Sequence, residues 1–161
     1  MRARLAASAV LVALLALGTT GCTYMTDQAT TTKYDPSDGI GTTLGDMQVV
    51  NALLVTADGA TASLLINLVN HSGYGVQVNI QYENSEKTKV NDSVYVNADS
   101  VKSLGGSDAS KLILSGIDAP AGSLFPVFLQ YGDVTGQQLW IPVLAPNGEY
   151  ASLAPESTPT P

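Results

Sequence analysis

Few residues of this chain have side chains suited to covalent or metal chemistry. The 161-residue sequence holds one cysteine, one histidine and three methionines. Cys22 follows Gly21 directly, and a thiolate is a good sulfur nucleophile, so this residue is able to accept a group through its sulfur. A disulfide within the chain is impossible. His71 and Met47 are soft ligands of the kind that suits Cu(I), and they form a metal site only if they meet in space.

The segment before Cys22 has the three parts of an export signal. Arg2 and Arg4 give a cationic start, residues 5–17 are apolar, and residues 18–21 are small and polar. As a helix the apolar run is roughly 20 Å long, which is too short for a hydrocarbon core of about 30 Å. We expect residues 1–21 to be a signal peptide that is removed. An ordinary secreted protein with an unused thiol and an uncleaved anchor are the alternatives.

The junction at Gly21 and Cys22 resembles the bacterial lipobox, in which a small residue precedes a cysteine that receives a diacylglyceryl thioether. Thr19 departs from that pattern, because the family usually has leucine there. The resemblance implies lipidation at Cys22 and a lipid-anchored position on the extracytoplasmic face of the cell membrane. One acyl chain binds a membrane marginally, whereas two or three hold firmly.

The charge of the remaining chain excludes one class of partner. Without residues 1–21, five lysines stand against fourteen acidic residues, a formal charge of −9. Nucleic-acid binding requires a basic surface, so we expect no nucleic-acid partner. Anionic lipid headgroups also repel such a chain, and we therefore expect the membrane to be contacted only through covalent lipid.

The rest of the sequence has the period of two that is typical of strands. Val76 to Tyr82 alternates most clearly between apolar and polar residues. Turn residues separate the expected strands, which cover residues 46–56, 64–69, 76–82, 94–96, 111–115, 124–131 and 138–143. This pattern predicts an all-β fold, an immunoglobulin-like antiparallel β-sandwich of about seven strands.

Two local features complete this prediction. Residues 99–104 have room for one helical turn. Pro126 and Pro142 lie inside strand patterns, which favours edge strands or bulges. The whole chain then divides into a lipoprotein signal peptide (1–21), a lipidated flexible tether (22–43), a β-sandwich domain (44–153) and a disordered Pro/Thr tail (154–161).

A longer resemblance begins after the cysteine. The stretch from Tyr34 to Val55, "YDPSDGIGTTLGDMQVVNALLV", and the stretch from Ala62 to Gly73, "ASLLINLVNHSG", resemble actinobacterial cell-envelope lipoproteins of LpqE type. The motif residues carried by this chain are Tyr34, Ser37, Asp38, Gly39, Gly45, Asp46 and Asn70.

Proteins of that type are distantly similar to copper chaperones with a cupredoxin-like sandwich, which bind Cu(I) through a spaced His/Met set. This chain has only His71, Met25 and Met47 after the signal, and the second half of that motif is missing. Copper transfer is therefore not carried over. A metal-handling protein with a diverged site at His71 and Met47 remains the alternative.

No catalytic motif is present. The sequence lacks a G-x-S-x-G elbow, a P-loop and a dinucleotide fingerprint, and we expect neither an enzyme nor a bound cofactor. Asp35, Asp38, Asp46 and Asp58 lack the spacing of a calcium loop and are interpreted as solvated turn residues.

Trp140 and Tyr150 are candidates for an aromatic surface that binds glycan or peptide. Trp140 alternates with Leu139 and Ile141, and we expect it to be partly buried. The predicted function is a non-catalytic binding or adaptor module of the cell envelope, with an envelope protein or a glycan as partner.

Overall fold

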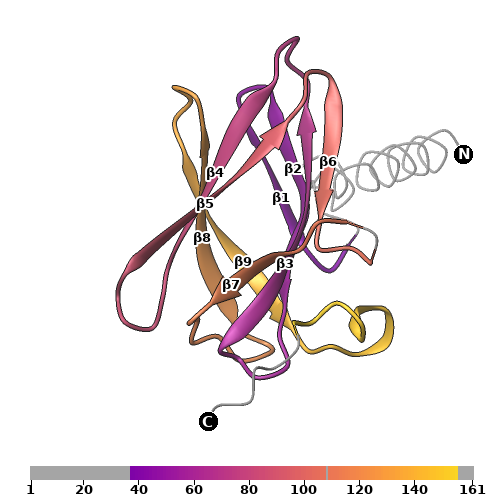
Figure 1. Cartoon of the computed structure of the whole chain (residues 1–161), viewed down its shortest axis with the longest axis vertical. Coiled ribbons are helices and arrows are strands. Elements are labelled where there is room, and N and C mark those ends of the chain that lie inside the picture. The colour runs from indigo at the N-terminus through magenta and orange to yellow at the C-terminus, as the bar shows by residue number, and fades with distance from the viewer. Residues whose placement is uncertain (1–36, 108, 156–161) are drawn as a thin grey trace, which may run out of the picture. The chain divides into compact units, whose positions relative to one another are not determined.

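The computed structural model describes residues 37–107 and 109–155, which form an all-β domain (Figure 1). The predicted all-β sandwich is confirmed, with nine strands in place of about seven. Cys22, residues 1–36 of the signal and tether, and residues 156–161 of the tail lie outside the described part. The strands are β1 (Ile40–Leu44), β2 (Met47–Val55), β3 (Thr61–Asn70), β4 (Val76–Glu83), β5 (Lys89–Val96), β6 (Ser100–Leu104), β7 (Leu112–Ser115), β8 (Leu124–Tyr131) and β9 (Gln137–Leu144), followed by the 3-10 turn η2 (Gly148–Tyr150).

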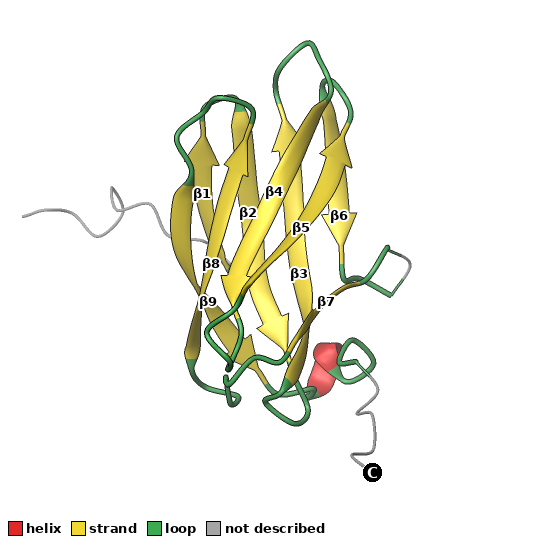
Figure 2. Ribbon diagram, turned by 60° about the vertical axis from the view of Figure 1, so that its left-hand side comes forward, coloured by secondary structure: helices red, strands yellow, loops and turns green. Residues whose placement is uncertain are grey.

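The strands form two layers that share one junction. One layer contains β1, β2, β3, β6 and β7, and the other has the order β5-β4-β8-β9. Figure 2 shows β4 and β5 crossing in front of β2 and β3. The layers join where the end of β9 pairs in parallel with the end of β2, Leu54 opposite Val143 and Val55 opposite Leu144. All the other strand pairings of the described part are antiparallel.

The main core lies between the layers. β4 confirms the predicted alternation, because Val78 and Ile80 are fully buried while Gln77 and Asn79 are exposed. β2 and β3 contain runs of consecutive buried residues, unlike a strand with one buried and one exposed face. The largest fully buried side chains of the main core are Met47, Leu54, Leu64, Ile66, Leu68, Ile80, Leu114, Leu129 and Ile141.

A second, smaller apolar cluster lies on the opposite side of β2 and β3. Leu53, Val55 and Leu65 are buried there. The segment after β9 covers them with half-buried side chains, Leu144, Tyr150, Leu153 and Ala154. The predicted boundary between domain and tail at residue 154 is therefore one residue too early, since Ala154 packs against this cluster.

Two strands were missed by the sequence pattern. β1 begins at Ile40, inside the predicted tether of residues 22–43, and pairs with β2 from Thr42 to Leu44. Its residues, IGTTL, are too polar and glycine-rich to give a strand signal alone. The helical turn predicted at residues 99–104 is wrong, because residues 100–104 form β6 and pair in register with β3.

Pro126 and Pro142 lie on interior strands, so their predicted place on edge strands was wrong. β8 lies between β4 and β9, and β9 joins β8 to β2. However, β8 pairs with β4 only from Phe128 to Tyr131, and β9 pairs with β2 only at residues 143–144. Each proline lies outside the part of its strand that is paired on both sides, so a missing amide donor is tolerated there.

Candidate functional site

The side chains of His71 and Met47 lie in different surroundings. The Met47 side chain is fully buried in the main core, whereas His71 is exposed just after β3, with its backbone N–H donating to the Asp46 carbonyl at 2.9 Å. Among the residues that the structure describes, no group of three or more His, Cys, Asp or Glu side chains is placed to hold a metal ion. The metal-handling alternative gains no support from this arrangement.

The glycines of the Ser-Asp-Gly and Gly-Asp motifs serve the fold. The Gly39 N–H donates to Oδ1 of Asn51 at 2.9 Å, at the point where the β2 register shifts and Asn51 has a φ of 52°. A Cβ on Gly39 would lie 2.6 Å from the Asn51 carbonyl carbon, so only glycine fits beside this bulge. Gly45 has a φ of 54°, and the next residue, Asp46, donates its N–H to the Tyr131 hydroxyl at 2.9 Å.

Asn70, the last motif residue, organises the loop between β3 and β4. It is only 2% exposed. Its Nδ2 donates to the carbonyls of Tyr74 and Asn97, at 2.8 and 2.9 Å, and its Oδ1 accepts from the N–H and the hydroxyl of Ser72, at 3.0 and 2.7 Å. A buried amide with all four bonds made is a structural element.

Trp140 is exposed, which corrects the expectation that it is partly buried. Leu139 and Ile141 alternate into the core, so Trp140 points outward from β9 with 54% of its surface exposed. Tyr150 does not share this exposure, because its ring packs on the second cluster and its hydroxyl donates to Asp38 at 2.9 Å. Burial, followed by the bond to Asp38, raises the pKa of Tyr150 to about 12. The predicted pair of surface aromatics is thus reduced to Trp140.

The surface around Trp140 is the outer face of the β5-β4-β8-β9 layer, and we call it the amide face. Strand pairing aligns its side chains in rows, one of which runs from Asn91 through Gln81 and Phe128 to Gln138. The next row contains Ser93, Asn79 and Gln130. Glutamine and asparagine dominate this face: Gln77, Asn79, Gln81, Asn91, Gln130 and Gln138.

A groove of about 410 Å³ crosses the amide face. It is lined by Gln81, Tyr82, Glu83, Lys89, Pro126, Phe128 and Gln138. Trp140 lies beside it, since it pairs with Pro126 across the strands and follows Gln138 by two positions on the same face. A Cβ on Gly136 would lie 2.3 Å from Cζ of Phe128, so the Phe128 ring lies close over that glycine.

A second hollow of about 730 Å³ lies further along β4. Its lining includes Tyr74, Gln77, Asn79 and Asp133. Successive outward residues of β4 therefore line both hollows, Gln77 and Asn79 in one and Gln81 and Glu83 in the other. Tyr74 and Tyr95, which are 63% and 61% exposed, lie near this second hollow.

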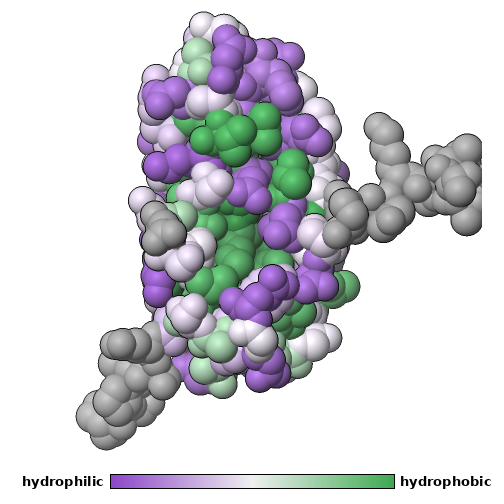
Figure 3. Space-filling model, turned by 90° about the vertical axis from the view of Figure 1, so that its right-hand side faces the viewer, coloured by the Kyte–Doolittle hydropathy of each residue, from purple (hydrophilic) through white to green (hydrophobic). Residues whose placement is uncertain are grey.

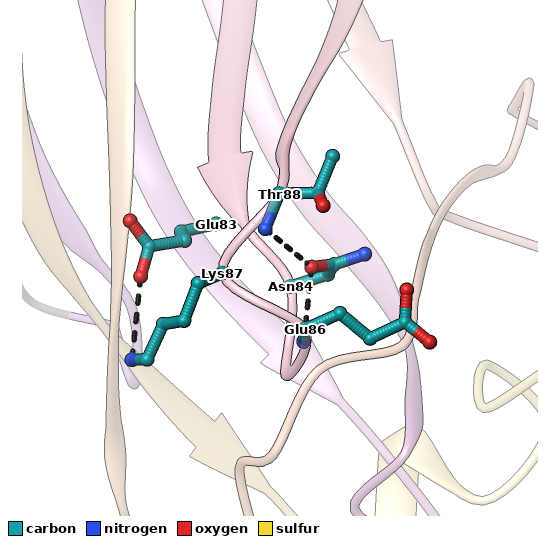
Figure 4. Close-up of polar contacts among 5 residues, drawn as sticks. All are labelled: Glu83, Asn84, Glu86, Lys87 and Thr88. Carbon is teal, nitrogen blue, oxygen red and sulfur yellow. Dashed lines mark hydrogen bonds and ion pairs between the residues drawn. The ribbon is translucent and has the colours of Figure 1, made fainter.

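The end of the groove carries charges of both signs. Figure 4 shows the β4–β5 turn, where the Lys87 ammonium lies 3.3 Å from the Glu83 carboxylate. Lys89 pairs opposite Glu83 across the strands. The turn itself is held by Oδ1 of Asn84, which accepts from the backbone N–H groups of Glu86 and Thr88 at 3.1 and 2.8 Å.

The side of the molecule that carries β6 is different in character, with hydrophobic residues gathered along it in Figure 3. Val69 pairs with Val101, which is 62% exposed, and Val50 lies on the adjacent strand. Val50, Val69 and Val101 thus extend the apolar surface of the second cluster along the outer side of β2, β3 and β6.

The chain matches no protein-family model, no curated protein and no solved structure. Within the described residues, no helix has the length and apolar character needed to cross a membrane.

The amide face was not predicted as a site. The sequence identified the outward residues of β4 only as a polar face, and glutamines on a half-buried strand are ordinarily solvated. Their alignment with Phe128 and Gln138 depends on which strands become neighbours. In the sequence, only Trp140 indicates a binding surface here, and it was predicted to be partly buried.

Proposed function

We propose that this chain is a lipoprotein, anchored through Cys22 on the extracytoplasmic face of the cell membrane, whose domain acts as a non-catalytic binding module. The amide face is its binding surface. The resemblance to a lipobox supports the anchor, and the sandwich provides a rigid frame for a surface built on strands.

The exposed Trp140 beside the groove is the observation that carries the binding role. Tryptophan is enriched where proteins contact ligands and partners, because it presents a large apolar area and one polar N–H. A lone exposed apolar residue needs no explanation. Trp140, however, adjoins Pro126 and a hollow that contains Phe128 and two glutamines.

The lining chemistry favours binding over catalysis. Among the described residues, the linings of the two hollows contain no serine, cysteine or histidine, three of the residue types that act as nucleophile or general base. The two described groups with clearly shifted pKa values are Asp58 and Tyr150. Both belong to turns and packing outside the hollows.

The anchor is tested by Cys22→Ser in cells of the source organism. We expect the native chain to incorporate radiolabelled palmitate and to partition into the detergent phase, and the variant to do neither. Thr23→Ser, which keeps the thiol, is the matched control. A Cys22→Ser chain that is still cleaved and still partitions with detergent would contradict the anchor.

The binding role is tested separately with residues 22–161 carrying Cys22→Ser. We expect this chain to sediment with cell envelopes stripped of their own copy, and Trp140→Ala to weaken the association. Val101→Ala removes an exposed apolar side chain from the opposite layer and should leave it unchanged. If all three chains sediment with the envelopes to the same extent, the amide face is not the binding surface.

A further inference from the structure

We propose that the amide face binds an uncharged, linear glycan that lies along β4 and stacks on Trp140. This inference rests on the proposed binding function and names the class of ligand.

The length of the site favours a chain of sugars over a single sugar. The two hollows follow one another along β4, from Gln77 to Glu83, a distance of roughly 20 Å at about 3.3 Å per residue. Aromatic side chains lie at both ends of this track, Trp140 near one hollow and Tyr74 near the other. Such a track accommodates several sugar rings in succession.

The chemistry of the face matches that of a pyranose ring. A pyranose has an apolar surface of C–H groups, which stacks on an aromatic ring, and hydroxyls around its edge. Each hydroxyl is both donor and acceptor, and so is each carboxamide. Gln81 and Gln138 flank Phe128 in one row, so amide groups stand on either side of an aromatic ring.

The charges favour a neutral ligand. The described lining of the groove includes one carboxylate and one ammonium group, Glu83 and Lys89, which lie opposite each other across the strands, so this lining has no net charge to attract an anionic polymer. The chain beyond residue 21 has a formal charge of −9, which repels polyanions over about one Debye length.

The arrangement differs from that expected of a protein partner. Protein interfaces concentrate their apolar anchors at the centre, surrounded by a polar rim. Here the strongly exposed aromatics lie toward the two ends, and amides occupy the middle of β4. That order suits a ligand with hydroxyls along its length.

Several amides are already held in place. Nε2 of Gln81 donates to Oδ1 of Asn91 at 2.6 Å, and Nε2 of Gln77 donates to the Ser93 hydroxyl at 2.7 Å. A side chain ordered before binding loses less conformational entropy on binding. Each glutamine also keeps its Oε1 as an acceptor for a sugar hydroxyl.

The test uses the fact that Trp140 is the only tryptophan, so tryptophan emission, excited selectively over tyrosine, reports on this site alone. Residues 22–161 with Cys22→Ser are titrated with neutral hexasaccharides of glucose, mannose, galactose, arabinose and N-acetylglucosamine. We expect at least one to change the emission and to bind at least tenfold more tightly than its disaccharide.

Calorimetry then compares variants with the hexasaccharide that binds. We expect Trp140→Ala to weaken binding about 5- to 50-fold, Trp140→Phe to restore part of the loss, and Gln138→Ala to weaken it about 3- to 10-fold. Val101→Ala should bind as the parent does, and thermal melting shows that each variant is folded.

Two results would overturn the inference and leave the binding function intact. One is that no neutral hexasaccharide binds while the chain still sediments with envelopes through Trp140, which would indicate a protein partner. The other is binding only to anionic polymers, with strong salt dependence. If Trp140→Ala changes neither sugar binding nor sedimentation, both the glycan site and the proposed function of the amide face are wrong.

Discussion

At the scale of single residues, Asp58 shows how one carboxylate fixes a turn. Its Oδ1 accepts from the backbone N–H groups of Thr61 and Ala60, both at 2.9 Å. The bond from Thr61, followed by that from Ala60, holds the pKa of Asp58 below its ordinary value. Because the folded state favours the ionised form, this carboxylate contributes stability above its unfolded pKa, and the contribution is lost as the pH falls through the folded pKa.

We therefore predict that Asp58→Asn lowers stability at pH 7 and has a smaller effect at pH 2.5, where more of the native carboxyl is protonated. Urea unfolding at both pH values measures this difference. Asp133→Asn, at an exposed turn residue, is the control and should change the free energy of unfolding little at either pH. An equal loss from Asp58→Asn at both pH values would show that charge is not the cause.

Asn70 is the polar residue whose replacement should cost most. We predict that Asn70→Ala destabilises the domain by about 2–4 kcal/mol, because it removes four hydrogen bonds of a buried amide and leaves the Ser72 N–H without its acceptor. Asn67→Ala, at a half-buried position of the same strand with one side-chain bond, from Ser103, should cost about 0.5–1.5 kcal/mol. Chemical denaturation measures both, and similar losses would contradict the special role of Asn70.

At the scale of elements, β4 is the strand whose two faces differ most. Val78 and Ile80 are 0% exposed, so truncating Ile80 to Ala should leave a cavity and cost about 2–5 kcal/mol, and Val78→Ala somewhat less. Asn79→Ser, between them on the amide face, should stay within about 0.5 kcal/mol. Thermal and urea unfolding of the three variants test this, and equal sensitivity on both faces would mean that the amide face is covered.

The same strand shows what the sequence alone predicted. β4, β8 and the β8–β9 hairpin follow from alternation and turn residues, which are local signals. β1 and β6 were missed because their strand character comes from pairing with β2 and β3, not from their own residues. The burial of Trp140 was predicted wrongly for a related reason. Alternation shows only that Leu139 and Trp140 face opposite sides of the strand. Which of these sides is buried depends on the apolar residues that pack against Leu139.

The candidate site was even less accessible to sequence reasoning. The row of Asn91, Gln81, Phe128 and Gln138 draws on four strands, and its members lie up to 57 positions apart in the sequence, from Gln81 to Gln138. Each member is unremarkable in its own strand. Only the strand order β5-β4-β8-β9 makes them neighbours, and the sequence does not fix that order.

At the scale of the whole molecule, the N-terminal strand β1 should be needed for stability. We predict that residues 35–161 unfold cooperatively and that residues 44–161, which lack most of β1, Gly39 and Asp38, are less stable by at least about 2 kcal/mol, since they lose a strand pairing and the bond to Tyr150.

Both truncated chains are compared by calorimetry with and without EDTA, and we expect the chelator to change neither transition. Equal stability of the two chains would show that β1 is dispensable. A transition lost in EDTA would show that a metal ion holds the fold.

The parallel pairing of β2 with β9 has a consequence for how fast the domain folds. Leu54 pairs with Val143, and the Thr42 hydroxyl donates to Gln137, 95 positions away in the sequence. The strand pairing that joins the two layers therefore forms only after the N-terminal and C-terminal strands come into contact. Closing such long loops costs chain entropy before any contact repays it. Topologies dominated by distant pairings fold in about milliseconds to seconds. Until β9 docks, the apolar ends of β2 and β3 stay open to water, and this late step is the point at which the chain is most exposed to aggregation.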